Sequence, residues 1–207
     1  MRSRTLRIVN VREKAKSGEI EEFHCLFLYL LVFSTMSGNK GDQREDVEYV
    51  LKELKEGSPY GEMFDVTYGE TTIDHNTELT KDESKTKPTF EIDNTKLKLK
   101  NQYLTLVMID PDAPSRDNPS SGPYLHYIVI NAQKMDLSDG TTICNYMGPS
   151  PPSGTGPHRY IFLLYISNDP IEHDKIQDSQ RRHFPIRNFV QKNNLGLEAA
   201  KNFITSG

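Results

Sequence analysis

Histidine and aspartate side chains in two stretches of the chain are the residues best suited to chemistry. Asp110 and Asp112 stand in an Asp-Pro-Asp-Ala-Pro segment that follows an apolar run, and His126 stands at the start of a second apolar run. His158 and Tyr160 begin a third apolar run, after a loop rich in proline and glycine. Because each group stands where a strand meets a loop, these side chains could converge at one end of a sheet.

Three kinds of chemistry fit this set of residues. Imidazole N–H groups, with loop amides from Gly154 to Gly156, could bind a phosphate-like anion while a carboxylate fixes the histidine tautomer. Two histidines and a carboxylate could also form a facial triad for iron. The third is hydrolysis by Ser150 beside His158, although Ser150 stands between two prolines and no Gly-X-Ser-X-Gly elbow is present. Histidines on strands often belong to the core, and Asp-Pro pairs often begin turns, so the pattern leaves these alternatives open.

The elements that must position these side chains are mostly strands. Residues 103–109 are apolar on both alternating faces, which predicts a strand covered on each side in the middle of a sheet. The two prolines that follow must end this strand in a stiff loop. Alternation resumes at 125, and along 158–165 it places His158 and Tyr160 on one face and Arg159 on the other.

The remaining segments predict smaller elements. Residues 42–56 have the apolar spacing of a helix that Gly57-Ser58-Pro59 ends, and a second short helix is predicted after Pro185. Residues 168–183 are expected to form a polar surface loop, and residues 197–207 no more than an edge element. Short antiparallel strands are predicted near 63–68, 71–74, 89–92 and 96–100.

Composition excludes several broad classes of protein. A chain of 207 residues with 35% apolar residues suits one domain with its own core. A net charge of −4 argues against a general nucleic-acid binder, whose surface would be basic. Only Cys25 and Cys144 are present, so no disulfide framework is expected, and Cys144 is predicted to be a core thiol.

The N-terminal segment, residues 1–36, is treated as an extension or a possible signal segment, and residues 37–207 as the domain. It carries basic and then acidic residues before an apolar run at about 23–33, which is too short to span a membrane. Acidic residues beside that run are unusual for a signal peptide. We therefore expect a cytoplasmic protein, with secretion as the alternative if residues 1–36 act as a signal peptide.

Two motifs resemble the signatures of the phosphatidylethanolamine-binding protein family, which includes the Raf kinase inhibitor protein. The first runs from Asp110 to Arg116 and is followed by His126 at the family's distance; the second runs from Gly148 to Tyr160. The resemblance covers roughly residues 45–203. It implies a mainly β fold of two antiparallel sheets with peripheral helices.

The resemblance also implies a function. The family's small pocket accepts phosphate-like anions and phospholipid headgroups such as phosphatidylethanolamine, and its members regulate a protein kinase or a serine protease by binding. We therefore expect a monomer that can contact a membrane peripherally and that has no cofactor, no nucleic-acid partner and no catalytic or metal-binding residue. The alternative is a metal-dependent or hydrolytic enzyme that uses the same Asp/His cluster. Carried over by position, the pocket lining is Asp110, Asp112, Pro114, His126, Gly148, Pro152, His158 and Tyr160.

Departures from the family pattern bear on the ligand. Tyr124 and Leu125 replace a frequent tryptophan, Ser121 replaces a frequent tyrosine at the rim, and Ser150 stands where many members have glycine. After Phe203 the chain is shorter than in many animal members, which continue into a C-terminal helix. These differences predict an altered headgroup preference and a more open pocket wall.

Overall fold

The structure is a computed structural model that describes residues 40–207, with side chains from residue 43. The prediction for residues 1–36 lies outside this part of the chain. In chain order the elements are α2 (Lys40–Gly57), η1 (Ser58–Met63), β1 (Phe64–Tyr68), β2 (Thr71–Thr72), β3 (Thr77–Glu78), β4 (Thr89–Ile92), β5 (Tyr103–Asp110), β6 (Tyr124–Ala132), β7 (Thr141–Cys144), β8 (Pro157–Ser167), η2 (Asp178–Gln180), α3 (Ile186–Lys192) and β9 (Gly196–Ser206).

A six-stranded sheet in the order β3-β9-β8-β5-β6-β7 forms the centre of the described domain. Its pairs are antiparallel except for the short β3–β9 pair. Strand β5 lies between β8 and β6, and its side chains from Leu104 to Ile109 are fully buried on both faces. The prediction of a central strand at 103–109 is therefore confirmed.

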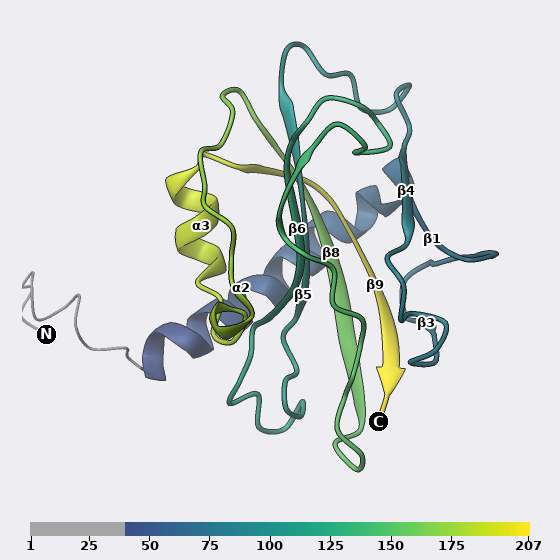
Figure 1. Cartoon of the computed structure of the whole chain (residues 1–207), viewed down its shortest axis with the longest axis vertical. Helices are drawn as coiled ribbons and strands as arrows, with labels where there is room; N and C mark the ends of the chain where they lie inside the picture. Colours follow the sequence, from purple (N-terminus) through teal and green to yellow (C-terminus); the bar gives the residue numbers. More distant parts are fainter. Residues whose placement is uncertain (1–39) are drawn as a thin grey trace, which may run out of the picture. The chain divides into compact units, whose positions relative to one another are not determined.

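Each face of the large sheet is covered by a different layer. The small sheet, in the order β2-β1-β4, packs Phe64, Val66 and Phe90 into the same apolar cluster as Leu106 of β5. On the opposite face, α2 and α3 complete a second cluster that contains Val107 of β5. In Figure 1, α3 lies to the left of the central strands and β1 and β4 to the right, while α2 starts at the left and passes behind these strands. The mainly β fold of two sheets with peripheral helices is confirmed.

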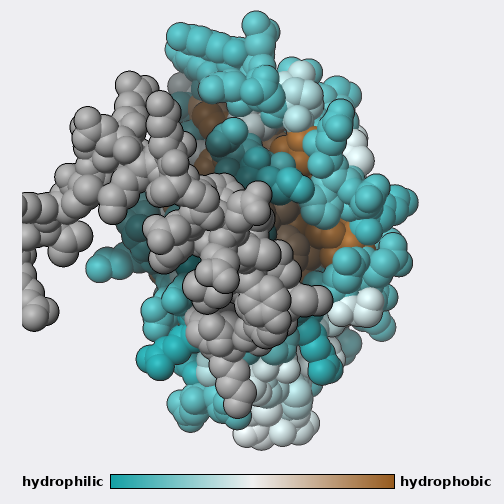
Figure 2. Space-filling model, turned by 90° about the vertical axis from the view of Figure 1, so that its left-hand side faces the viewer, coloured by the Kyte–Doolittle hydropathy of each residue, from teal (hydrophilic) through white to brown (hydrophobic). Residues whose placement is uncertain are grey.

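The surface of the described domain is mostly polar. Tyr60 is the one large hydrophobic side chain classed as exposed within residues 43–207. In Figure 2 hydrophilic residues cover most of the visible described surface, and hydrophobic residues show in recesses between them. No helix within residues 40–207 is both long enough and apolar enough to cross a membrane. Cys144 is fully buried, as predicted for a core thiol.

Two predictions of secondary structure were wrong. Residues 96–100 form no strand. The backbone nitrogens of Lys96 and Leu97 donate to the carbonyl oxygen of Asp93, which makes a turn at this point. Residues 197–207 form far more than an edge element: β9 has 11 residues, pairs with β8 along most of its length and with β3 at Phe203 and Ile204.

Strand β9 accommodates α2 by small residues at their contact. A Cβ atom placed on Gly57, the last residue of α2, would lie 2.7 Å from both the Cβ and the backbone nitrogen of Ala200. Real Cβ atoms do not approach backbone so closely, and the Ala200 backbone cannot easily move because it is paired with Leu163 of β8. Gly57 and Ala200 together set how closely α2 approaches the sheet.

We predict that Gly57→Ala lowers the free energy of unfolding by about 1–3 kcal/mol, because the added methyl group overpacks this contact. The measurement is urea unfolding followed by circular dichroism. Gly196→Ala is the matched control, since its Cβ would meet nothing closer than Ile166 at 3.9 Å, and we expect it to change stability by less than about 0.5 kcal/mol. Equal stability of the two variants would contradict the close contact.

Candidate functional site

The three strands that carry the predicted residues meet at one end of the large sheet. Asp110, the last residue of β5, lies opposite Tyr124, the first residue of β6, and Ile109 lies opposite Ile161 near the start of β8. Because β5 is antiparallel to both neighbours, its end lies beside both of their starts. This register brings Asp110, His126 and His158 together, as the sequence predicted.

The loop before β8 reaches this end of the sheet through glycines. Gly154 and Gly156 both have φ of +79°, a left-handed conformation that is strained for residues with a side chain. A Cβ atom on Gly148 would lie 3.0 Å from the backbone of Lys85 and Ser84, so a side chain there would press on the neighbouring segment. These glycines allow the loop to turn and to pack closely before it enters β8.

Asp110 and His158 form a buried ion pair. His158 Nδ1 lies 2.8 Å from Asp110 Oδ2, and the side chains of His158 and Asp110 are 1% and 4% exposed. The other ring nitrogen, Nε2, lies 3.0 Å from the carbonyl oxygen of Pro114 and 3.1 Å from Thr155 Oγ1. Thr155 donates its own proton to the Pro152 carbonyl, so its oxygen is free to accept. Every neighbour of the His158 ring nitrogens is therefore an acceptor.

These acceptors indicate that His158 is a charged imidazolium with both nitrogens donating. Burial alone would lower the pKa of His158, but the hydrogen bond and negative charge of Asp110 outweigh it and raise the pKa above its ordinary value. The charge of His158 is thus matched by Asp110, and both of its N–H groups are used inside the protein.

Asp112, the eighth residue of the predicted set, is not among the residues that line the pocket. Its carboxylate accepts three hydrogen bonds from Arg159, at 2.9 Å from the backbone nitrogen, 2.9 Å from Nε and 2.6 Å from Nη2. Its backbone nitrogen donates to Asp110 Oδ1 at 2.7 Å. The reason is the alternation of β8: His158 and Arg159 point to opposite faces, and each takes one of the two aspartates.

His126 has the opposite character to His158. Its Nδ1 lies 2.7 Å from the carbonyl oxygen of Met147, which can only accept, so Nδ1 carries the proton. Burial lowers the pKa of His126, against a smaller opposing effect of the Asp110 charge. Burial therefore disfavours the charged form of this ring. Tyr124 and Tyr160 lie on either side, with ring centroids 5.2 Å and 5.1 Å from that of His126.

Seven of the eight predicted residues line one pocket of about 230 Å³. Burial raises the pKa of Tyr160, so its hydroxyl stays protonated at neutral pH. The full lining is Asp110, Ala113, Pro114, Ser121, Tyr124, His126, Met147, Gly148, Ser150, Pro151, Pro152, His158, Tyr160 and Arg182.

Sequence reasoning missed Arg182, because the charged run at 178–183 was interpreted as solvated surface. Its neighbour Arg181 is in fact only 2% exposed. The Arg181 guanidinium donates to the carbonyl oxygens of Leu125, His126 and Asn145 at 2.9–3.1 Å, and to Asp178 at 2.7 Å. This anchor fixes the loop against β6 and leaves the exposed Arg182 beside the pocket. Nothing in the sequence distinguishes the two arginines.

The geometry does not favour the two enzymatic alternatives. A metal ligand needs a free lone pair on nitrogen, and both nitrogens of His158 donate to protein oxygens. Within the described residues, no three His, Cys, Asp or Glu side chains lie together in an arrangement that could hold a metal ion. Ser150 lines the pocket, but the ring nitrogens of His158 face Asp110, Pro114 and Thr155, so His158 has no nitrogen placed to activate it.

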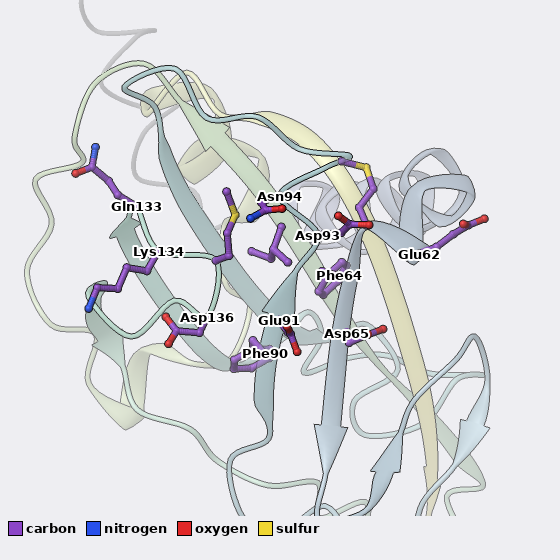
Figure 3. A pocket seen from close by; sticks show the side chains of 13 residues that line it. Glu62, Phe64, Asp65, Phe90, Glu91, Asp93, Asn94, Gln133, Lys134 and Asp136 are labelled. Atoms are coloured by element: carbon purple, nitrogen blue, oxygen red, sulfur yellow. The ribbon is translucent and has the colours of Figure 1, made fainter.

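A second hollow, of about 790 Å³, lies between β1, β4 and the loop after β6 (Figure 3). Apolar side chains such as Phe64 and Phe90 form its floor, and Lys134 is a basic residue in its lining. The acidic residues that line it are Glu62, Asp65, Glu91, Asp93 and Asp136. It holds none of the residues predicted from the motifs. The smaller pocket is therefore the candidate site.

Comparison with known proteins agrees with the motifs. A family model described as phosphatidylethanolamine-binding protein matches residues 65–205. A Drosophila melanogaster protein named for odorant binding, protein A5, is 29% identical over 199 residues, which is 91% of each chain. A 26 kDa secreted antigen of Toxocara canis is 38% identical over 111 residues; these are 51% of this chain but 42% of that protein, so the match spans less than half of its length.

A solved structure shows the same fold. Carboxypeptidase Y inhibitor, in complex with its cognate proteinase, superposes with a TM-score of 0.63 and 22% identity, and the match covers 84% of this chain and 98% of that chain. The shared architecture supports the two-sheet description given above.

The buried ion pair predicts how stability depends on pH. The pKa of His158 is raised above 6.5 in the folded state, so the folded protein holds a proton that the unfolded chain releases. The contribution of this ion pair to the free energy of unfolding is fully present below about pH 6.5. It is lost as the pH rises through the folded-state pKa of His158, at up to about 1.4 kcal/mol per pH unit.

We therefore expect the free energy of unfolding, measured in urea from pH 6 to pH 9, to fall with rising pH in the native protein. His158→Gln should be less stable at pH 6 and should lack this fall, since glutamine does not titrate. If the variant keeps the same slope, another group is responsible and the imidazolium assignment is wrong.

Proposed function

The chain belongs to the phosphatidylethanolamine-binding protein family, and from this premise we propose that its small pocket binds phosphate-bearing headgroups and that the protein acts by binding. The observation that carries the proposal is the convergence of seven motif residues and Arg182 on one pocket. Phosphate needs hydrogen-bond donors and positive charge, and a site at the mouth of a rigid core can hold both in place.

Arg182 supplies the positive charge in this proposal. His158 is also cationic, but Asp110 neutralises it within the wall of the pocket. Arg182 is exposed and has no ion pair or hydrogen bond among the described residues. A planar guanidinium can contact two phosphate oxygens at once, so Arg182 is the group we expect to meet the anion.

The size of the pocket supports a headgroup as the ligand. Its volume of about 230 Å³ is below the range typical of sites for drug-sized molecules. A phosphate with a short substituent fits this volume, whereas the acyl chains of a phospholipid must remain outside it. Binding to a lipid would then place the pocket mouth at a membrane surface, which is the peripheral contact expected from the sequence.

We extend the proposal to regulation by binding. Carboxypeptidase Y inhibitor, which has this fold, occurs in a complex with its cognate proteinase, and on this basis a serine protease is the first partner to test; a protein kinase is the second. Inhibition of a purified protease by the full chain would support this role. The compartment stays a prediction: cytoplasmic, with secretion as the alternative that the secreted relative from Toxocara canis favours.

Titration with phosphorylethanolamine tests the proposed pocket. We expect binding by the native protein and a dissociation constant about fivefold higher for Arg182→Gln, because one exposed charge contributes about 1 kcal/mol. Isothermal titration calorimetry at low salt measures both. Lys175→Gln is the matched control, since it removes one exposed positive charge outside the pocket lining.

Equal binding by Arg182→Gln and the control would remove Arg182 from the site, and an absence of binding to the native protein would refute the anion pocket. Arg182 is a cleaner probe than His158, because removing His158 leaves the buried Asp110 carboxylate without its partner and weakens the fold.

A further inference from the structure

We infer that the second hollow, between β1, β4 and residues 133–136, is a docking groove for an extended basic segment of another protein, which adds to β4 as a further strand. The groove has a volume of about 790 Å³ and shares no lining residue with the small pocket. It is therefore a second surface, and its role does not depend on the proposed function. Three features carry the inference: an unpaired strand edge, an apolar floor and an excess of carboxylates at the rim.

Strand β4 is an edge strand, and its backbone shows which side is open. It pairs with β1 on one side. On the other side the Ile92 nitrogen donates to the carbonyl oxygen of Met135 at 2.9 Å. Backbone groups two residues apart in a strand point the same way, so the N–H and C=O of Phe90 face this side as well. Neither group has a hydrogen-bond partner within the described residues.

The groove lies along this open edge. Phe90 and Ile92 line it from β4, and residues 133–136 complete it. Unpaired N–H and C=O groups at a strand edge are a template for a further strand, and proteins bind extended peptides at such edges. The open part is short, because Pro88 precedes the four residues of β4 and the Ile92 nitrogen is already bonded. Main-chain bonds alone would hold a peptide weakly, so side chains must contribute.

The floor of the groove offers an apolar contact. The Phe90 ring stacks on Tyr127, with ring centroids 6.2 Å apart, and meets Phe162 edge-on at 5.8 Å. Met63 and Met135 are half-buried in the lining, and methionine side chains adjust to the shape of an apolar partner. A strand added to β4 directs every second side chain toward the face of Phe90. We expect these side chains of the partner to be apolar.

The opposite face of the added strand meets carboxylates. Asp65 of β1 and Glu91 of β4 lie directly opposite each other in the strand register, and both are exposed. Like charges in such a cross-strand pair destabilise a sheet. Lys201 lies 3.6 Å from Asp65, whereas Glu91 has no ion pair within the described residues. Figure 3 shows Asp65 on one side of Glu91 and Asp136 on the other.

The balance of charge selects a basic partner. Of the described residues that line the groove, five are acidic and one, Lys134, is basic. Glu62 and Asp65 each have a lysine partner. The lining carboxylates without an ion pair in this part of the chain are Glu91, Asp93 and Asp136. Nucleic acids and acidic membranes would be repelled by this rim. The occupant that fits is an extended segment in which basic and apolar residues alternate.

Peptide titration of the full chain tests the groove. The probe is a fluorescein-labelled peptide of alternating lysine and valine, and fluorescence anisotropy at low salt measures its affinity. We expect it to bind, and a peptide with glutamate in place of lysine not to bind. A peptide of the same composition, with its lysines and valines in separate blocks, should bind at least about tenfold more weakly, because it cannot present charges to one face and apolar groups to the other.

Glu91→Lys is the test variant. It should bind the probe about tenfold more weakly, because a repulsion replaces an attraction between exposed charges. The fold is not at risk, since a lysine opposite Asp65 removes the repulsion between the two carboxylates. Stability in urea should be equal to that of the native protein or higher. Glu70→Lys is the matched control, because it makes the same change of charge at an exposed residue outside the groove.

Amide hydrogen exchange at Phe90 distinguishes strand addition from attraction between charges alone. The Phe90 N–H is unpaired in the free protein, and saturating probe should slow its exchange by at least about tenfold. The Glu91 N–H faces β1 and is the internal control, so its exchange should not change. Nuclear magnetic resonance of the full chain measures both amides in one experiment.

Each contrary outcome overturns a defined part of the inference. Equal binding of the lysine and glutamate peptides, or of the probe by Glu91→Lys and Glu70→Lys, shows that the acidic rim does not select the partner. Binding that leaves the Phe90 amide unchanged shows that no strand is added. Slow exchange at Phe90 in the free protein shows that another part of the chain or a second copy already pairs with β4. Phosphorylethanolamine addresses the small pocket, so its failure to bind would leave this inference standing.

Discussion

The buried contact between Asp110 and His158 is the interaction on which the site depends. A charge that is removed from water must be paired and hydrogen-bonded, and this pair joins the last residue of β5 to the second residue of β8. The same aspartate accepts the Asp112 backbone, and the same histidine donates to the Pro114 carbonyl. Satisfying one buried charge thus folds the Asp-Pro-Asp-Ala-Pro segment back over the strand ends and builds one wall of the pocket.

This pairing determines the electrostatic character of the pocket. The charged groups of the motifs neutralise one another: Asp110 holds His158, and Asp112 holds Arg159. The pocket is then lined by the His126 ring, whose pKa burial lowers, and by the exposed cation Arg182. The charged residues that make the motifs recognisable therefore largely pair with one another and support the pocket wall.

The sequence predicts those features that are determined by neighbouring residues, and it does not predict those that depend on contacts between distant parts of the chain. The central strands and the site residues on them follow from alternation and from proline and glycine, which act within a few residues. The burial of Arg181 depends on carbonyls of Leu125, His126 and Asn145 that lie far away in the chain, so its separation from Arg182 could not be predicted. The pairing of Asp112 with Arg159, 47 residues later in the chain, could not be predicted for the same reason. The full length of β9 follows its pairing with β8, from Gly196 opposite Ile166 to Ser206 opposite Pro157, and these partner residues lie 30 to 49 positions earlier in the chain.

The close contact between Gly148 and the segment at Ser84 and Lys85 has a consequence for the rate at which a ligand would exchange. The backbone of Lys85 and Ser84 occupies the space beside Gly148, and Ser84 also accepts a hydrogen bond from Tyr146 at 2.6 Å. The loop segment at Gly148 that lines the pocket is thus held in place by these contacts in the absence of a ligand. A site formed in advance loses little freedom on binding and needs no slow rearrangement. Association should then proceed at the rate of diffusion and orientation, and ligands of different affinity should differ mainly in their residence time.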